Sequence, residues 1–306
     1  MKRFISAVLL LFPAFFSFSQ NNSKSGEAAK SSLLWKISGN GLEKPSYLFG
    51  TIHMLCEEDA MLSDSLKKAI RNCDNVYLEV QMDNIMEMIG MLGQLNMKDD
   101  TTLADLLSKE DYNKVKKYFE EKGSMLPFSM LETMKPILAA SMLEENSLPC
   151  GTPVAMEQKI MEAAKDNEKS IKGLETMAYQ ASVLDSIPYK IQAMQLVSYI
   201  DSANKGVDEN KEFNELLEAY KAQDLKRLED LMVKSDIGMS SYTDVLLYNR
   251  NRNWVRKLKN ILPGKSLVIA VGAGHLPGDQ GVISLLRKEG YTVTPVINTV
   301  SKTKSI

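Results

Sequence analysis

Two short segments near opposite ends of the chain share one pattern, and this pattern constrains the fold more than any other feature. Tyr47–His53 reads YLFGTIH and Leu267–His275 reads LVIAVGAGH, so each is an apolar, strand-like run that ends in Gly-x-x-His. The histidines of these motifs, His53 and His275, are the only two in the chain. A lone histidine at a strand end is more often structural than functional, but two matched copies that use every histidine favour one shared site.

The glycines of the two motifs, Gly50 and Gly272, give a physical reason for the pattern. A glycine after a strand lets the backbone turn or approach a neighbour closely, and the next residues then project from the carboxyl end of the strand, where open α/β sheets bind ligands. A helix-like segment and a second strand-like run follow each motif: Ser63–Asn72 and Val76–Met82, then Gly281–Gly290 and Tyr291–Val296. Two such units suggest two halves of one sheet, related by a pseudo-twofold axis.

The rest of the chain predicts the architecture around these units. Leu33–Gly39 and Ser46–His53 indicate a hairpin at the start of the domain. Helical spacing extends from about residue 83 to about residue 263 and is almost continuous over Tyr179–Lys234, whereas Ser170–Glu175 is typical of a brief strand. We therefore expect an α/β fold: a small mixed sheet formed by the N- and C-terminal units, with a large helical middle region.

The N-terminal residues are typical of an export signal. Lys2 and Arg3 precede an apolar run, Phe4–Phe18, that is too short to span a membrane. Cleavage of this signal would place the protein in the periplasm or outside the cell, without an integral membrane span. The predicted organisation is a signal peptide over 1–19, a disordered lead-in over 20–32, one domain over 33–300 with a helical insert at about 83–263, and a tail over 301–306.

Composition does not favour two kinds of partner, and it does not determine how the cysteines pair. The formal net charge is −2 and no basic run is present, so nothing favours nucleic acid or an anionic membrane. The three cysteines, Cys56, Cys73 and Cys150, could form one disulfide and leave one thiol, but their spacing does not indicate the pair. Cys56 closely follows His53, so a thiol nucleophile is an alternative to buried or bridged cysteines.

Two charged residues extend the candidate site. Glu79 lies among the apolar residues of Val76–Met82, where a carboxylate is costly unless it is paired, bound to a ligand or exposed at the strand end. If this strand is parallel to the first motif, Glu79 emerges at the same sheet edge as His53. Arg250, in the helix that precedes the second motif, could clamp a substrate oxygen, although an arginine on a basic helix is often a solvated surface charge.

Five more residues could support the four candidate site residues, His53, His275, Glu79 and Arg250, without binding the substrate themselves. Gly50 and Gly272 would allow the close backbone approach described above. Glu157 and Glu175 could orient a histidine or could face solvent, and Asn251 adjoins Arg250.

Taken together, these residues resemble the TraB/GumN family, which includes the TIKI proteases. The similarity covers roughly Leu33–Val296 and rests on five features: the first GTIH, the carboxylate in the next strand, GLETxxxQ from Gly173, RN at Arg250, and VGAGHLPGxxGVIxLLRxxGY from Val271. Many members have Gly-x-Asp where this chain has Met156–Glu157. The resemblance implies an α/β fold related to erythromycin esterase-like and ChaN-like proteins, with His53, Glu79, Arg250 and His275 marking the site.

The resemblance also implies a function, with alternatives. TIKI members look like proteases that use Mn or Co, so it implies an extracytoplasmic metallopeptidase in which His53, Glu79 and His275 hold the ion that activates water. The chain has no HExxH motif, so metal binding rests on the resemblance alone. Esterase-like relatives imply a hydrolase without a metal, in which a histidine is the general base. ChaN-like relatives imply a protein that binds haem, a metal or a peptide without turnover. The substrate would be a peptide or a small molecule, and the oligomeric state is open.

Overall fold

The computed structural model describes residues 32–122, 126–145, 150, 153–204, 210–234 and 240–300. The expected signal peptide and tail lie outside the described residues, as does nearly all of the expected lead-in. The chain divides into two compact units. The helical unit holds the described residues of Asn84–Pro149 and Met177–Asn214, and the sheet unit holds those of Ala14–Asp83, Cys150–Thr176 and Glu215–Ile306.

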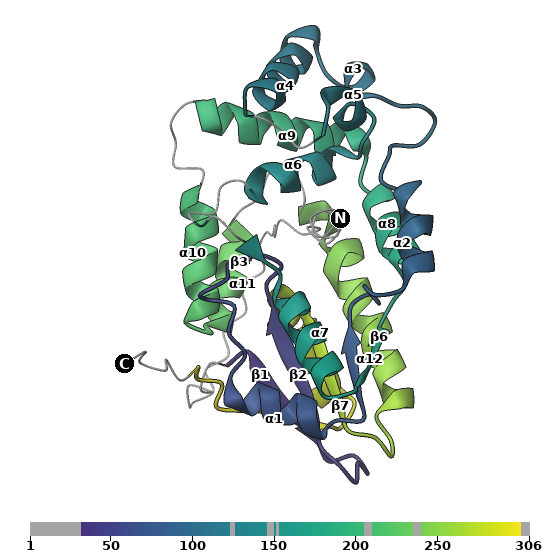
Figure 1. Cartoon of the computed structure of the whole chain (residues 1–306), viewed down its shortest axis with the longest axis vertical. Coiled ribbons are helices and arrows are strands. Elements are labelled where there is room, and N and C mark those ends of the chain that lie inside the picture. The colour runs from purple at the N-terminus through teal and green to yellow at the C-terminus, as the bar shows by residue number, and fades with distance from the viewer. Residues whose placement is uncertain are drawn as a thin grey trace. The chain divides into compact units, whose positions relative to one another are not determined.

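The sheet unit contains a six-stranded sheet in the order β6-β4-β7-β2-β1-β8 (Figure 1). Its strands are β1 (Leu34–Ser38), β2 (Ser46–Thr51), β4 (Asn75–Leu78), β6 (Ser170–Gly173), β7 (Leu267–Gly272) and β8 (Thr292–Pro295). The four strands from β6 to β2 are parallel, whereas β1 is antiparallel to both β2 and β8. The predicted mixed sheet from the two ends of the chain is therefore confirmed, and the brief strand expected at Ser170 joins it as β6.

The strands of the two GxxH motifs are immediate neighbours. β2 and β7 pair in parallel, with Gly50 opposite Val271 and Thr51 opposite Gly272. Both strands therefore end at the same edge of the sheet, and the residues that follow them start side by side. β7 is apolar and buried over Leu267–Val271, as expected for a central strand that is covered on both faces.

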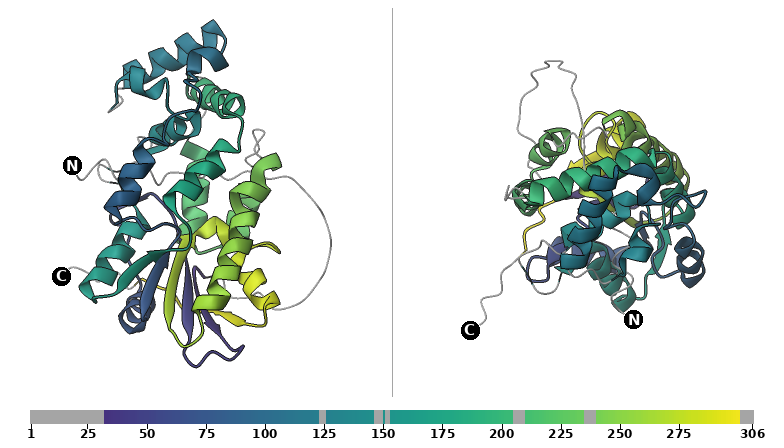
Figure 2. Two further views of the ribbon diagram at one scale, coloured as in Figure 1. Left: turned by 90° about the vertical axis from the view of Figure 1, so that its right-hand side faces the viewer. Right: turned by 90° about the horizontal axis from the view of Figure 1, so that it is seen from above.

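Helices cover both faces of this sheet (Figure 2, left). α1 (Asp64–Asn72) and α7 (Met156–Asp166) pack together on one face, and α12 (Asn249–Ile261) and α13 (Val282–Lys288) pack together on the other. The connecting helices α1 and α13 thus lie on opposite faces, as a twofold axis between β2 and β7 requires. The symmetry stops there, because the hairpin strand β1 lies between β2 and β8, whereas β7 itself lies between β2 and β4.

α1 shows how local sequence sets these helices. Ser63 caps its N-terminus, where the hydroxyl accepts a hydrogen bond from the Leu66 amide at 3.1 Å. Asp64 in the first turn and Arg71 in the last complement the helix dipole. Its apolar stripe, which includes Ile70, is buried against the sheet.

A second, smaller sheet adjoins the first motif. β3 (Leu55–Cys56) pairs with β5 (Pro153–Val154), and Cys56 forms a disulfide with Cys150 at a Cα–Cα distance of 5.7 Å. Cys73 is free and buried. Because its sulfur is in this bond, Cys56 cannot act as a thiol nucleophile, which decides against that alternative.

The helical unit contains α2 (Ile85–Leu92), α3 (Leu103–Leu106), α4 (Lys109–Lys122), α5 (Phe128–Leu131), α6 (Pro136–Glu145), α8 (Met177–Asp185) and α9 (Tyr189–Asn204). The boundary between the units falls within α10 (Asn210–Lys221), and α11 (Leu225–Lys234) belongs to the sheet unit. The near-continuous helix expected over Tyr179–Lys234 is broken before Tyr189, because Pro188 cannot continue a helix. A second break follows α10, at Gln223 with a φ of 56°. No helix within the described ranges is both long and apolar enough to cross a membrane.

Candidate active site

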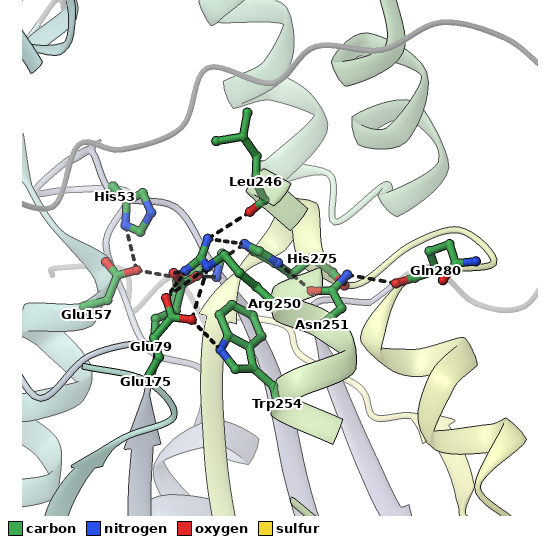
Figure 3. A network of polar contacts seen from close by, with 12 residues as sticks. His53, Glu79, Glu157, Glu175, Leu246, Arg250, Asn251, Trp254, His275 and Gln280 are labelled. Carbon is green, nitrogen blue, oxygen red and sulfur yellow. Dashed lines mark hydrogen bonds and ion pairs between the residues drawn. The ribbon is translucent and has the colours of Figure 1, made fainter. Parts of the chain in front are cut away.

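The side chains of the two histidines and Glu79 converge beside Gly272 at the carboxyl edge of the sheet. Figure 3 shows these three side chains around Arg250. A methyl carbon placed on Gly272 would lie 3.3 Å from Glu79 Oε1, 3.6 Å from His275 Cδ2 and 3.9 Å from His53 Nε2. His53 reaches this point from the loop after β2, and His275 reaches it from η4 (Ala273–His275), a 3-10 turn after β7. We call the space beside Gly272 the Gly272 cradle.

The two motif glycines are needed for space rather than for an unusual backbone. Neither Gly50 nor Gly272 has a positive φ, and that of Gly272 is −49°. A methyl carbon on Gly50 would lie 2.8 Å from Leu276 Cδ1 and 3.1 Å from Ala273 Cα. Gly50 therefore lets the second motif pack directly on the first strand, and Gly272 leaves the cradle open.

Arg250 is completely buried and lies at the centre of a polar network. Its Nη2 donates to Glu79 Oε2 at 2.6 Å and to Glu175 Oε1 at 2.5 Å, and its Nε donates to Glu175 Oε1 at 2.9 Å. Its Nη1 lies 3.2 Å from both the Leu246 carbonyl oxygen and His275 Nε2. Arg250 is therefore not a solvated surface charge, and each of its nitrogens already has an acceptor.

A π-helical turn and a tryptophan help to place Arg250. The turn, η3 (Asp244–Tyr248), follows the short η2 (Ser240–Tyr242) and leads directly into α12. One turn after Arg250, the indole Nε1 of Trp254 donates to Glu175 Oε2 at 2.9 Å. The guanidinium carbon lies 4.7 Å from the centre of the Trp254 ring, which also lies 4.4 Å from that of His275. Trp254 therefore packs against Arg250 and His275 and also binds Glu175.

His275 is held as a neutral ring. Asn251 Nδ2 donates to the Gln280 carbonyl at 2.8 Å, so its Oδ1 faces His275 Nδ1 at 2.6 Å and must accept the ring proton. The other nitrogen, Nε2, then accepts a hydrogen bond from Arg250. Burial, together with the positive charge of Arg250, lowers the pKa of His275 to about 3.

Glu79 is buried but ionised. Burial alone would raise the pKa of this carboxyl, but the charge of Arg250 outweighs it, together with His275, which is charged only at the low pH where Glu79 itself titrates, His53 and the Gly272 amide, and the pKa falls to about 2. The amide of Gly272 donates to Glu79 Oε1 at 2.7 Å. A carboxylate held in this way can orient a water molecule in the cradle.

His53 has the opposite environment. Its Nδ1 lies 2.9 Å from Glu157 Oε1, and the hydroxyl of Thr51 donates to the same oxygen at 2.5 Å. Burial lowers the pKa of His53, but the Glu157 carboxylate, helped by that of Glu79, outweighs this and raises it to about 9. The two matched histidines thus differ in charge at neutral pH.

The structure brings every candidate from the sequence to this one region: His53, His275, Glu79, Arg250, Gly50, Gly272, Glu157, Glu175 and Asn251. Sequence reasoning missed Thr51 and Trp254. The place of Thr51 inside GTIH and the helical spacing of Trp254 from Arg250 are signals that could have pointed to them.

The arrangement does not fit a metal ion held jointly by His53, Glu79 and His275. Asn251 and Arg250 occupy both ring nitrogens of His275, and Arg250 also binds Glu79. The guanidinium thus places a cation where an ion between these two residues would lie. Among the residues that the structure describes, no three His, Cys, Asp or Glu side chains are grouped as ligands.

The opposite environments of the histidines predict two separate titrations. His53, with its pKa raised from 6.5 to about 9, stabilises the fold below pH 6.5, and this contribution is lost as pH rises through 9. His275, with its pKa lowered from 6.5 to about 3, destabilises the fold progressively as pH falls from 6.5 towards 3. Because the chain has only two histidines, NMR of the ring protons resolves both directly. Two rings that titrate together near pH 6.5 would contradict the described contacts.

The fold and the site define a class of α/β protein in which two GxxH histidines meet a buried carboxylate–arginine network at the edge of a mixed sheet. The chain belongs to the TraB/PrgY/gumN family, whose model matches residues 33–295, so the predicted family is confirmed.

The relatives whose names suggest an activity share about a quarter or less of their aligned residues with this chain. The chain is 23% identical over 313 residues to Metalloprotease TIKI2 of Danio rerio, covering 86% of this chain and 60% of that protein. It is 24% identical over 335 residues to Metalloprotease TIKI1 of Homo sapiens, covering 92% and 66%. It is also 24% identical over 242 residues to the uncharacterized protein YbaP of Escherichia coli (strain K12), covering 79% and 87%. No solved structure matches significantly. The chain thus spans less than two thirds of the length of the TIKI2 relative.

Proposed function

We propose that this protein is a hydrolase that activates water in the Gly272 cradle to cleave an amide or ester bond, with peptides as the preferred substrates. The observation that carries the proposal is the convergence of an ionised carboxylate and two imidazoles on one point, within 4 Å of a single carbon position. The names of the TIKI relatives support peptides as substrates.

The chemistry needs only groups on this chain. Glu79 Oε1 accepts a hydrogen bond from the attacking water, and the neutral form of His53 accepts a water proton at Nε2 as the oxygen attacks the carbonyl carbon. His53 then gives this proton to the leaving nitrogen or oxygen as its bond to the carbonyl carbon breaks. The products are an acid and an amine or alcohol, and His53 returns to its starting state.

Arg250 and His275 keep the cradle in shape in this proposal. The nitrogens of Arg250 already meet acceptors, so we assign it to holding Glu79 rather than to clamping a substrate oxygen. His275 stays neutral and offers its Nε2 to Arg250. Both act as positioning residues, while His53 and Glu79 touch the water.

Cleavage of a peptide library by the purified protein tests this function. We expect a rate that rises with pH towards 9, the pKa of His53, because only its neutral form accepts a proton. His53→Ala should lower kcat/KM by about 10²–10⁴-fold without loss of folding, the usual contribution of a general base. No cleavage of peptides or esters under any condition would contradict the proposal.

The same assay separates this mechanism from a metal-dependent one, which the relatives' names favour. Because the ligand set does not fit, we expect a chelator to leave the activity unchanged. Loss of activity with chelator, restored by Mn²⁺ or Co²⁺, would show a metallopeptidase of the TIKI type instead. A haem, metal or peptide ligand bound with no turnover would favour the third alternative from the sequence.

We also propose that the protein works outside the cytoplasm. The disulfide between Cys56 and Cys150 supports this, because such bonds persist mainly in oxidising compartments.

A further inference from the structure

The two GxxH histidines are each held at the same ring atom, but by different chemical groups. An amide oxygen of Asn251 lies 2.6 Å from His275 Nδ1, whereas a carboxylate oxygen of Glu157 lies 2.9 Å from His53 Nδ1. Both groups can accept the Nδ1 proton, but only the carboxylate stabilises the charged ring that forms when Nε2 takes up a second proton. The partner at Nδ1 therefore distinguishes the ring that can carry a proton from the ring that stays fixed.

Among the described residues, Glu157 forms an ion pair with His53 alone. It lies in the first turn of α7 and is only 3% exposed. Oε1 accepts a hydrogen bond from the Thr51 hydroxyl and forms an ion pair with His53 Nδ1, a contact that does not have the geometry of a hydrogen bond. Oε2 is buried without a hydrogen-bond partner among the described residues and points away from the network (Figure 3). No lysine or arginine in the described part of the chain pairs with Glu157, so it is not a member of a general surface ion network.

The backbone fixes the distance between His53 and Glu157. The Met156 amide donates to the Ile52 carbonyl at 3.3 Å, which joins the two residues that directly precede Glu157 and His53. Just beyond, β3 pairs with β5, and the Cys56–Cys150 disulfide closes the same junction. Thr51, fully buried at the end of β2, then aligns the carboxylate with its hydroxyl.

We propose that Glu157 is the positioning residue of His53, and that Thr51 in turn positions Glu157. Together these two residues form what we call the His53 clamp. The clamp keeps a proton on Nδ1, so that in the neutral ring the lone pair is on Nε2, the atom that faces the Gly272 cradle. Its catalytic consequence rests on the proposed function, but its effect on the ring does not.

NMR of protein labelled with ¹⁵N-histidine tests the clamp without a substrate. We expect Nδ1 of His53 to keep its proton at neutral and at mildly alkaline pH. In Glu157→Gln the neutral ring should shift towards the form protonated at Nε2, because an amide can present its NH₂ group to Nδ1. A native His53 ring whose neutral form is protonated at Nε2, or a ring unchanged in Glu157→Gln, would overturn the proposal.

Steady-state kinetics test the effect of the His53 clamp on catalysis. Glu157→Gln should lower kcat at least about tenfold while KM stays within about twofold, because the base is misaligned but the binding surface is unchanged. Glu157→Asp, which keeps the charge, should recover part of kcat. Glu162→Gln, at an exposed position on the same helix, is the matched control and should leave both constants unchanged. A folded Glu157→Gln protein with the native kcat would overturn the proposal.

Thr51→Val decides the matter if Glu157→Gln does not fold. Valine keeps the shape of threonine and removes only the hydroxyl, so we expect a smaller loss of kcat and a detectable change at the His53 ring. A Thr51→Val protein with both the native kcat and the native ring signals would overturn the proposal. If the native protein cleaves nothing, the proposed function fails, and the NMR result alone still decides the clamp.

Discussion

Replacing Gly272 with alanine is expected to lower kcat/KM by about 100-fold or more while the protein stays folded, because the loss of correct placement at a reacting centre has effects of this size. The added methyl would lie 3.3 Å from Glu79 Oε1 and 3.9 Å from His53 Nε2, in the space that we assign to the attacking water. The φ of −49° at this position suits alanine, so the substitution adds no backbone strain. Steady-state kinetics and thermal unfolding measure the two effects separately.

Gly90 supplies the control for this experiment. It lies in α2 of the helical unit, and a methyl carbon there would meet nothing within 4 Å. Gly90→Ala should leave kcat/KM unchanged. A Gly272→Ala protein with the native activity would show that water is not activated in the cradle.

Replacing Arg250 with alanine is expected to have the largest effect on stability. It would leave Glu79 and Glu175 buried without their cation, and breaking a buried pair from one side costs about 3–5 kcal/mol. For a chain of this size such a loss lowers Tm by roughly 6–20 °C. Arg250→Lys should recover little, because a single ammonium group cannot replace a fork that contacts Glu79, Glu175 and His275 together. Calorimetry of the purified variants measures these shifts.

Arg252 provides a matched substitution on the same helix. Its side chain is 40% exposed and pairs with Asp244 at 3.5 Å. Arg252→Ala should therefore change the free energy of unfolding by less than about 0.5 kcal/mol. If Arg250→Ala melts at the same temperature as Arg252→Ala, the polar network does not hold the sheet edge together.

The meeting of the two motifs could be predicted because it depends on local rules. An apolar run followed by glycine indicates a strand end, and a helix between two strands makes them parallel. These rules place Glu79 at the same edge as His53 and bring the strand of His275 into the same sheet. The scarcity of histidine then singled out the two residues that the structure brings together.

The contacts that distinguish the two histidines could not be predicted in the same way. Glu157 and Asn251 reach the rings from helices far along the chain, and their placement depends on how those helices pack against the sheet. The complete burial of Arg250 could not be predicted either, because its helix also carries a basic outer face on which an arginine would be exposed. The break at Pro188 was missed although the proline is plain in the sequence, because the residues on both sides of it have helical spacing.

The position of β7 has a consequence for how the protein is made. β7 separates β2 from β4, so those two strands keep unpaired inner edges until nearly the whole polypeptide has left the ribosome. During that time the β1–β2 hairpin and the β4–β6 pair present open edges that can join other chains, which is the usual route to aggregation. A product truncated before β7 would keep both of these inner edges unpaired and would lack His275.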